Sequence, residues 1–189
     1  MNTISVNLNR IIVIILSIIC AAPFLIISLF IKFTSKGPII HWSKRIGKDN
    51  CTFFMPKFRT LKVNTPDIAT HLLTDYEKYS FGFGTFLRKT SMDELPQLWS
   101  VFKGDMNFVG PRPALHNQHD LVKLRTEKNI HLVKPGITGW AQINGRDEIS
   151  IESKVMLDFE YCKKRSLFFD LYIIFFTVIS VLRKKGINH

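Results

Sequence analysis

Two neighbouring acidic residues, Asp93 and Glu94, follow closely on two cationic residues, Arg88 and Lys89. A carboxylate beside positive charge can approach an anionic phosphate, where it can act as a nucleophile or help to hold a divalent metal. Ser91 lies three residues before Glu94, and this spacing is also typical of a capping box at the start of a helix. Two roles therefore stay open for the acidic pair: chemistry at a phosphate, or capping a helix and complementing its dipole.

The helix that such a capping box would start is expected to run toward Phe102. Its apolar residues Leu95, Leu98, Trp99 and Phe102 recur at helical spacing. We expect these four side chains to be buried on one face.

Upstream of the acidic pair, two short strands are predicted at Ile39–Trp42 and Cys51–Arg59, joined by a turn through Gly47–Asn50. Lys57 and Arg59 alternate at the end of the second strand. In a strand both side chains would point the same way, as a phosphate clamp requires. A solvated basic edge is the alternative explanation for this pair.

Two loops downstream carry further cations. Arg112 lies between Pro111 and Pro113, which restrict its backbone and would lower the entropy lost when it binds a diphosphate. A purely structural turn is the alternative. The glycine-rich segment Lys134–Arg146 has a cation at each end, so its backbone amides and Arg146 could bind phosphate. It matches no standard nucleotide-binding motif.

The first of two apolar segments, Ile11–Ile31, has 21 residues without a charge, which is enough for a helix to cross a bilayer core. Pro23 lies just past its middle and must bend or break that helix. Either a bent spanning helix or a helix that enters and leaves on one side is compatible with the segment. In both cases the cations that follow it predict a cytoplasmic location for the rest of the chain.

The second apolar segment closes the chain and has one narrow polar stripe at helical spacing. The stripe consists of Ser166, Asp170, Thr177, Ser180 and Lys184. This pattern predicts a helix lying at a membrane interface, with the basic residues after it contacting anionic headgroups. A helix in the core of the catalytic domain is the alternative.

The charge of the chain is strongly positive, with 26 Lys and Arg against 15 Asp and Glu, a formal net charge of +11. This excess predicts a polyanionic partner, and the apolar ends favour a membrane and phosphorylated substrates over nucleic acid. Three widely spaced cysteines, Cys20, Cys51 and Cys162, are expected to be free thiols in a reducing compartment.

Taken in order, these motifs resemble those of the bacterial sugar transferases, the monotopic phosphoglycosyl transferases. The matching segments are Gly37–Pro38, Lys57–Thr60, Leu87–Trp99, Lys103–Met106, Val109–Pro113 and Lys134–Trp140. The chain resembles the minimal catalytic form of this family. The resemblance implies transfer of a sugar 1-phosphate from a UDP-sugar, an N-acetylhexosamine or a deoxy derivative of one, to polyprenyl (undecaprenyl) phosphate. UMP is released, and surface polysaccharide or glycoconjugate synthesis begins.

The resemblance also implies roles for the residues named above. Asp93 takes the place of the nucleophile that forms a covalent phosphosugar ester, and Glu94 that of its partner, with Mg²⁺ as cofactor held by the pair. The cations at positions 88, 112 and 146 match phosphate-binding positions, with Lys57 and Arg59 as further candidates. Asp158 matches an acidic residue at the edge of the site.

The family further implies an α+β, mostly helical fold with a short β-hairpin and amphipathic interfacial helices. We expect a re-entrant membrane helix in residues 1–36, a cytoplasmic catalytic domain in 37–165 and an interfacial helix in 166–189, on a bacterial inner membrane with anionic lipid. Family members often have serine before the breaking proline, and Ala22 stands there in this chain.

Overall fold

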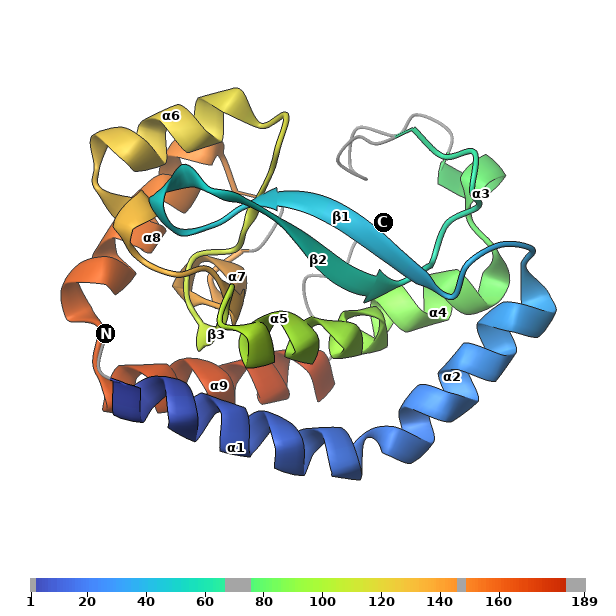
Figure 1. Ribbon diagram of the computed structural model, residues 1–189. Coiled ribbons are helices and arrows are strands. Elements are labelled where there is room, and N and C mark those ends of the chain that lie inside the picture. Colours follow the sequence, from blue (N-terminus) through green and yellow to red (C-terminus); the bar gives the residue numbers. More distant parts are fainter. Residues whose placement is uncertain (1–2, 67–75, 146–148, 183–189) are drawn as a thin grey trace. The chain divides into compact units, whose positions relative to one another are not determined.

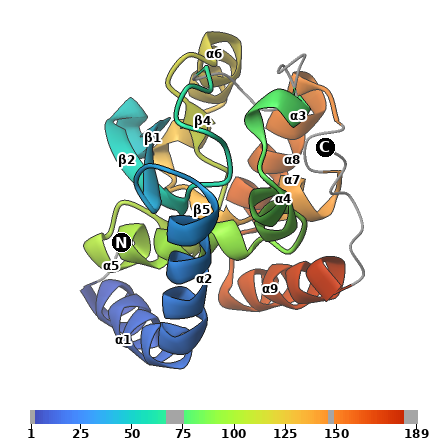
Figure 2. The ribbon, with the colours of Figure 1, turned by 90° about the vertical axis from the view of Figure 1, so that its right-hand side faces the viewer.

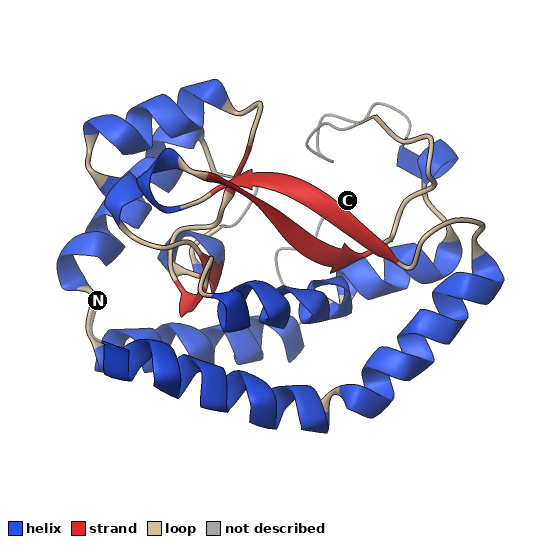
Figure 3. Ribbon diagram, viewed as in Figure 1, coloured by secondary structure: helices blue, strands red, loops and turns tan. Residues whose placement is uncertain are grey.

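A computed structural model describes residues 3–66, 76–145 and 149–182 of the chain. The protein is mostly helical with a small sheet, as predicted (Figure 3). The packing divides the chain into two compact units. Of the described residues, the first unit comprises 3–43, 55–66 and 76–102, and the second comprises 44–54, 103–145 and 149–182. The predicted division at residues 36 and 165 concerns the membrane and stays a prediction.

The first unit contains most of the N-terminal half of the fold. Its elements are the helices α1 (Thr3–Ile19), α2 (Ala21–Thr34), α3 (Tyr76–Tyr79), α4 (Gly82–Lys89) and α5 (Leu98–Lys103), whose last residue belongs to the second unit, and the 3₁₀ helix η3 (Met92–Gln97). The strands β1 (Ile40–Ile46) and β2 (Thr52–Phe58) form the predicted hairpin, whose base belongs to this unit and whose tip belongs to the second. The hairpin turn contains η1 (Lys48–Asn50), in which Asp49 and Asn50 adopt left-handed backbone angles (φ 55° and 57°). Both residue types tolerate that conformation.

The predicted bend in the N-terminal apolar segment is confirmed, and it lies one turn before Pro23. Helix α1 ends at Ile19, α2 begins at Ala21, and the described part of the pair is bent by 61° (Figure 1). A proline ring clashes with the carbonyl four residues before it, so the break falls at Cys20 rather than at Pro23 itself. Among the described residues, no single helix is long and apolar enough to cross a membrane, but this bent pair meets both criteria together.

The core of the first unit forms where α2 packs against the end of β2 and against α4. Ile27, Ile31, Phe58 and Leu87 are buried there, and the rings of Phe24 and Phe58 lie 4.7 Å apart. This core fixes the end of β2, and therefore the position of Lys57 one residue earlier.

The helix predicted after Ser91 differs from the expectation in its geometry. It starts as the 3₁₀ helix η3, which contains Pro96, and continues as α5. A 3₁₀ helix has three residues per turn, so the buried face shifts along the sequence. Gln97, Ser100 and Val101 are buried, whereas Trp99 is 52% exposed, and the prediction that Trp99 is buried was wrong.

The second unit contains the tip of the β1–β2 hairpin, a two-stranded sheet and several helices. Its elements are β3 (Asn107–Val109), β4 (Ala114–Leu115), α6 (His119–Glu127), η4 (Ile130–Leu132), β5 (Gly136–Thr138), α7 (Trp140–Ile143), α8 (Ile151–Lys164) and α9 (Leu167–Leu182). Strand β4 pairs with the tip of β1 in antiparallel register, and β3 pairs with β5 in parallel register. Helix α7 packs against both α8 and α9 (Figure 2).

Asp170 and Thr177, two members of the predicted polar stripe of helix α9, face the rest of the second unit, while much of the apolar surface of the helix points outward. The Tyr161 hydroxyl donates to Asp170 Oδ1 (2.8 Å), and the hydroxyls of Thr138 and Thr177 share a hydrogen bond (2.7 Å). On the other faces, large apolar side chains are exposed, with Phe168 84% accessible. A core helix would bury these side chains, so the arrangement favours the interfacial interpretation.

Cys162, on α8, provides a pH-dependent test of this packing. Burial raises the pKa of its thiol to about 11. Alkylation requires the thiolate. At pH 8 the alkylation rate of Cys162 should therefore be lower than that of the exposed Cys51 by a factor of about ten or more. The rate at Cys162 should keep rising with pH up to about pH 11. Peptide mapping after iodoacetamide treatment would measure both rates, with Cys51→Ser and Cys162→Ser as controls. Equal rates at pH 8 would show that α8 does not bury this thiol.

Candidate active site

The acidic pair in the first unit is held by Lys57. The Lys57 Nζ lies 2.8 Å from Glu94 Oε1 and 3.9 Å from Asp93 Oδ2, and all three side chains are largely shielded from solvent. Lys57 comes from β2, and both carboxylates come from the start of η3. Asp93 is 8% exposed. Charges interact more strongly where water is excluded, so the Lys57 ammonium and the two carboxylates attract each other strongly in this cluster.

The capping box predicted for Ser91 and Glu94 does not form. Ser91 adopts a left-handed conformation (φ 56°), and its side chain does not cap η3. The Glu94 carboxylate instead accepts a hydrogen bond from Lys57 (2.8 Å). Capping therefore does not explain Glu94, and the arrangement favours a chemical role for the pair.

Arg59 does not share the direction of Lys57. The Arg59 N–H still donates to the Ile39 carbonyl (2.9 Å), but its side chain lies against residues 35–38 rather than with Lys57 at the acidic pair. The Arg59 guanidinium donates to the carbonyls of Ser35, Lys36 and Pro38 and to the Ser35 hydroxyl, at 2.6–2.9 Å. It is 5% exposed, and burial lowers its pKa from the usual arginine value. The predicted clamp of Lys57 and Arg59 on one phosphate is corrected accordingly.

Arg88 lies in the last turn of α4 and is partly buried. Helix α4 packs against η3, so the same unit contains this cation and the acidic pair. The prediction that Arg88 binds phosphate is compatible with this position.

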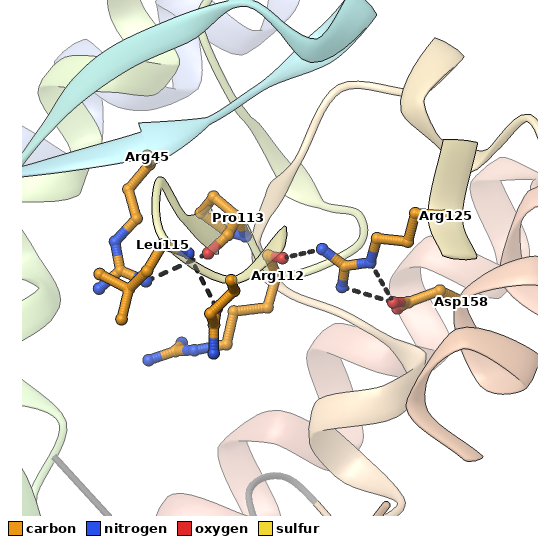
Figure 4. Close-up of polar contacts among 7 residues, drawn as sticks. Arg45, Arg112, Pro113, Leu115, Arg125 and Asp158 are labelled. Carbon is orange, nitrogen blue, oxygen red and sulfur yellow. Dashed lines mark hydrogen bonds and ion pairs between the residues drawn. The ribbon is translucent and has the colours of Figure 1, made fainter. Parts of the chain in front are cut away.

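Arg112 belongs to the second unit, in the loop between β3 and β4 (Figure 4). The backbone carbonyl of Arg112 accepts a hydrogen bond from Arg125 (2.8 Å), and that of Pro113 accepts one from Arg45 (3.2 Å). The loop is therefore held by cationic side chains as well as restricted by its prolines.

Asp158 is buried in the second unit rather than open at the edge of a site. It is 1% exposed, and its Oδ2 accepts hydrogen bonds from Arg125 Nε (3.0 Å) and Nη2 (2.5 Å). Burial raises the pKa of Asp158, and the Arg125 guanidinium opposes that rise. The prediction of direct substrate contact at Asp158 is corrected to an internal ion pair. Sequence reasoning missed Arg125, although the apolar residues Leu121 and Leu124 beside it indicate a helix face that packs inward.

The glycine-rich segment forms β5 and α7. Its amides are partly used inside the fold, because the Gly136 N–H donates to the Pro111 carbonyl (3.0 Å) and the Gln142 N–H donates to the Gly139 carbonyl (3.1 Å). Arg146, the remaining predicted phosphate ligand, lies outside the described residues.

The donor set of the acidic pair suits a hard divalent cation. Mg²⁺ is commonly bound by one or two protein carboxylates, with water and substrate phosphate completing its shell. Asp93 and Glu94 supply two adjacent carboxylates. The described part of the chain has no group of three or more His, Cys, Asp or Glu that could hold a metal alone. The residues therefore fit a cation shared with a phosphorylated substrate.

The candidate site thus combines a shielded pair of carboxylates with a lysine from the neighbouring strand. The chain belongs to the bacterial sugar transferase family, whose model matches residues 2–184. It is 46% identical over 154 residues to the uncharacterized sugar transferase EpsL of Bacillus subtilis, covering 80% of this chain and 74% of that protein. It is 34% identical over 189 residues to the exopolysaccharide production protein ExoY of Sinorhizobium fredii, covering 91% of this chain and 83% of that protein.

A further relative is named for a reaction. The UDP-glucose:undecaprenyl-phosphate glucose-1-phosphate transferase of Escherichia coli is 40% identical over 167 residues, covering 85% of this chain and 36% of that protein. The chain thus spans about a third of the length of that relative.

The hydrogen bonds of Arg59 lead to a stability prediction. Arg59→Lys keeps the charge but loses the planar fork, so the free energy of unfolding should fall by about 1.5–3 kcal/mol. Denaturant unfolding of the detergent-solubilised protein would measure this change. Lys36→Gln alters an exposed cation in the same segment and should change stability by less than about 0.5 kcal/mol. Unchanged stability combined with weaker binding of UDP would instead assign Arg59 to a ligand.

Proposed function

We propose that the protein transfers a sugar 1-phosphate from a UDP-sugar to polyprenyl phosphate, giving a polyprenyl diphosphate sugar and UMP. The observation that carries this proposal is the shielded cluster of Lys57, Asp93 and Glu94. Membership of the bacterial sugar transferase family supports it. So does the E. coli relative, whose name gives UDP-glucose and undecaprenyl phosphate as its substrates.

In the proposed first step, an Asp93 carboxylate oxygen attacks the phosphorus that carries the sugar. A phosphorus–oxygen bond forms to Asp93, the bond to UMP breaks, and UMP leaves with the bonding electrons. In the second step a polyprenyl phosphate oxygen attacks the same phosphorus, and the bond to Asp93 breaks. The aspartate is regenerated, so two displacements replace one direct reaction between two anions.

Lys57 serves this chemistry by keeping the acidic pair ionised and in place. An opposite charge nearby favours the anionic form of a carboxylate, and the nucleophile must be anionic. The short contact with Glu94 fixes the partner, while the longer contact with Asp93 costs less to give up as the carboxylate approaches phosphorus. Glu94 is proposed to assist proton transfer or metal binding.

Mg²⁺ is the proposed cofactor, held by Asp93 and Glu94 together with substrate phosphate. When bound, it supplies positive charge that offsets repulsion between the carboxylates and the diphosphate. Arg88, Arg112 and Arg146 are proposed to bind phosphate groups.

The identity of the transferred sugar is a separate part of the proposal. An N-acetylhexosamine or a deoxy derivative was expected from the family resemblance. The names of relatives broaden the choice, since they include a UDP-glucose:undecaprenyl-phosphate glucose-1-phosphate transferase and an undecaprenyl-phosphate galactose phosphotransferase. UMP release from a panel of UDP-hexoses and UDP-N-acetylhexosamines would decide between them.

Membrane attachment is proposed through the bent pair of α1 and α2 and the outward apolar surface of α9. The pair is bent by 61°, which supports a re-entrant arrangement with both ends on the cytoplasmic side of a bacterial inner membrane. Exposed side chains such as Phe168 on α9 would lie among anionic lipid headgroups.

The role of Asp93 is tested by its conversion to asparagine. Asp93→Asn should fold normally, keep binding UDP-sugar and lose nearly all turnover, because an amide is not a competent nucleophile. The unmodified enzyme should release about one UMP per active site before lipid phosphate is added, as expected for a covalent intermediate. Intact-protein mass spectrometry should show an added phosphosugar that Asp93→Asn lacks. Turnover with both substrates but without burst or adduct would indicate direct transfer.

The topology is tested by labelling a cysteine placed at position 2 in a Cys20→Ser, Cys51→Ser, Cys162→Ser background. In intact spheroplasts this thiol should resist a membrane-impermeant maleimide and should react after lysis. Pro23→Leu restores the missing backbone donor and removes the clash, so it should favour a straight spanning helix and increase labelling from outside. Ready labelling of the protein with Pro23 intact would contradict the re-entrant arrangement.

A further inference from the structure

We propose that Arg125 and Asp158 form a buried positioning pair that fixes the backbone of Arg112, and through it the guanidinium that binds substrate phosphate. This inference rests on the proposed function of Arg112. It assigns Arg125 and Asp158 a role in the reaction without contact with the substrate.

The loop Pro111–Pro113 is held through all three of its carbonyl groups. The Pro111 carbonyl accepts a hydrogen bond from the Gly136 N–H (3.0 Å). The Arg112 carbonyl accepts one from Arg125 Nη1 (2.8 Å), and the Pro113 carbonyl accepts one from Arg45 Nη1 (3.2 Å). Figure 4 shows the two arginine contacts from opposite sides of the loop. Three separate elements therefore specify three consecutive peptide units.

The loop depends on such contacts because its prolines cannot donate hydrogen bonds. Pro111 and Pro113 have no backbone N–H, so only Arg112 can donate a backbone hydrogen bond from this loop. A pocket lined by Pro111–Pro113, Arg125, His131 and neighbouring residues borders the loop. Close packing is therefore incomplete on that side, and the carbonyl contacts have to define the loop conformation.

Arg125 is suited to this task by the shape of its side chain. Its Nε and Nη2 engage Asp158, while its Nη1 reaches the Arg112 carbonyl. A planar fork can bridge two acceptors in fixed directions, which a lysine ammonium cannot do. Asp158 thus orients Arg125, and Arg125 orients the backbone of Arg112.

Stabilisation alone is a weak explanation for this pair. Arg125 is 7% and Asp158 1% exposed, and the removal of two charges from water costs nearly as much as, or more than, their attraction returns. Apolar residues of similar volume often stabilise a protein equally well or better. What an apolar pair cannot provide is a donor for the Arg112 carbonyl.

The test replaces the pair by apolar residues, as Arg125→Met with Asp158→Leu in one chain. The melting temperature should be kept or raised, because the core stays filled. The dissociation constant for UDP with Mg²⁺ and the KM for UDP-sugar should rise by about tenfold to a hundredfold, as expected when a binding group is misplaced. Leu121→Ala, on the same helix as Arg125, is the matched control: it should lower the melting temperature and leave the affinity for UDP unchanged.

A background with Arg112→Lys separates positioning from general damage. Arg112→Lys alone should weaken UDP binding, and adding the apolar pair should then change binding by less than about twofold, because effects through one group do not add. Full additivity, or unchanged UDP affinity in the folded apolar variant, would overturn the positioning role. If UDP binding follows the expected pattern but no UMP is released from any UDP-sugar, the positioning pair stands and the proposed reaction fails. If the unmodified chain does not bind UDP, both fail.

Discussion

The ion cluster of the first unit places the Lys57 ammonium against two adjacent carboxylates, Asp93 and Glu94. Asp93 and Glu94 are adjacent and largely shielded from water, so the positive charge of Lys57 offsets part of the repulsion between them. Lys57 is placed by the end of β2, where Phe58 anchors the strand in the core with Ile27, Ile31 and Leu87 of the neighbouring helices. The packing of α2 and α4 on this strand therefore also positions the cation that contacts the acidic pair.

Buried and partly buried arginines perform a second, structural task that is the same in both units. Arg59 donates hydrogen bonds to backbone carbonyls of the segment that ends at Pro38. Arg45 and Arg125 donate to carbonyls of the loop Pro111–Pro113. Segments with proline lack backbone donors, so their carbonyls need partners from elsewhere. A guanidinium supplies up to five donors in one plane and can satisfy several such groups at once. The net charge of +11 is thus partly used inside the fold, and only the remainder can attract anions.

The local features of the fold could be predicted where one residue type dictates the backbone. Pro23 required a bend, and the polar turn through Asp49 and Asn50 required a hairpin reversal; both are present. The face of the helix after Ser91 could not be predicted, because the pattern assumed 3.6 residues per turn and the 3₁₀ geometry of η3 left Trp99 exposed. Pro96 lies inside η3 and is buried, and such burial is a tertiary property that the local pattern does not contain.

The candidate site shows the same division between local and tertiary information. The sequence identified the acidic pair and Lys57 as residues suited to phosphate chemistry, but spacing cannot tell whether a cation contacts a ligand or a carbonyl. Arg59 fails as a clamp because its guanidinium is bound to the carbonyls of Ser35, Lys36 and Pro38. Asp158 lies three residues from each of the buried residues Val155 and Tyr161 and so shares one face of α8 with them. This spacing predicts that Asp158 is buried. A buried carboxylate requires a buried cation, yet nothing in the spacing selects Arg125 among 26 lysines and arginines. The packing of α6 against α8 brings Arg125 to Asp158. The same packing places Arg125 where it donates a hydrogen bond to the Arg112 carbonyl.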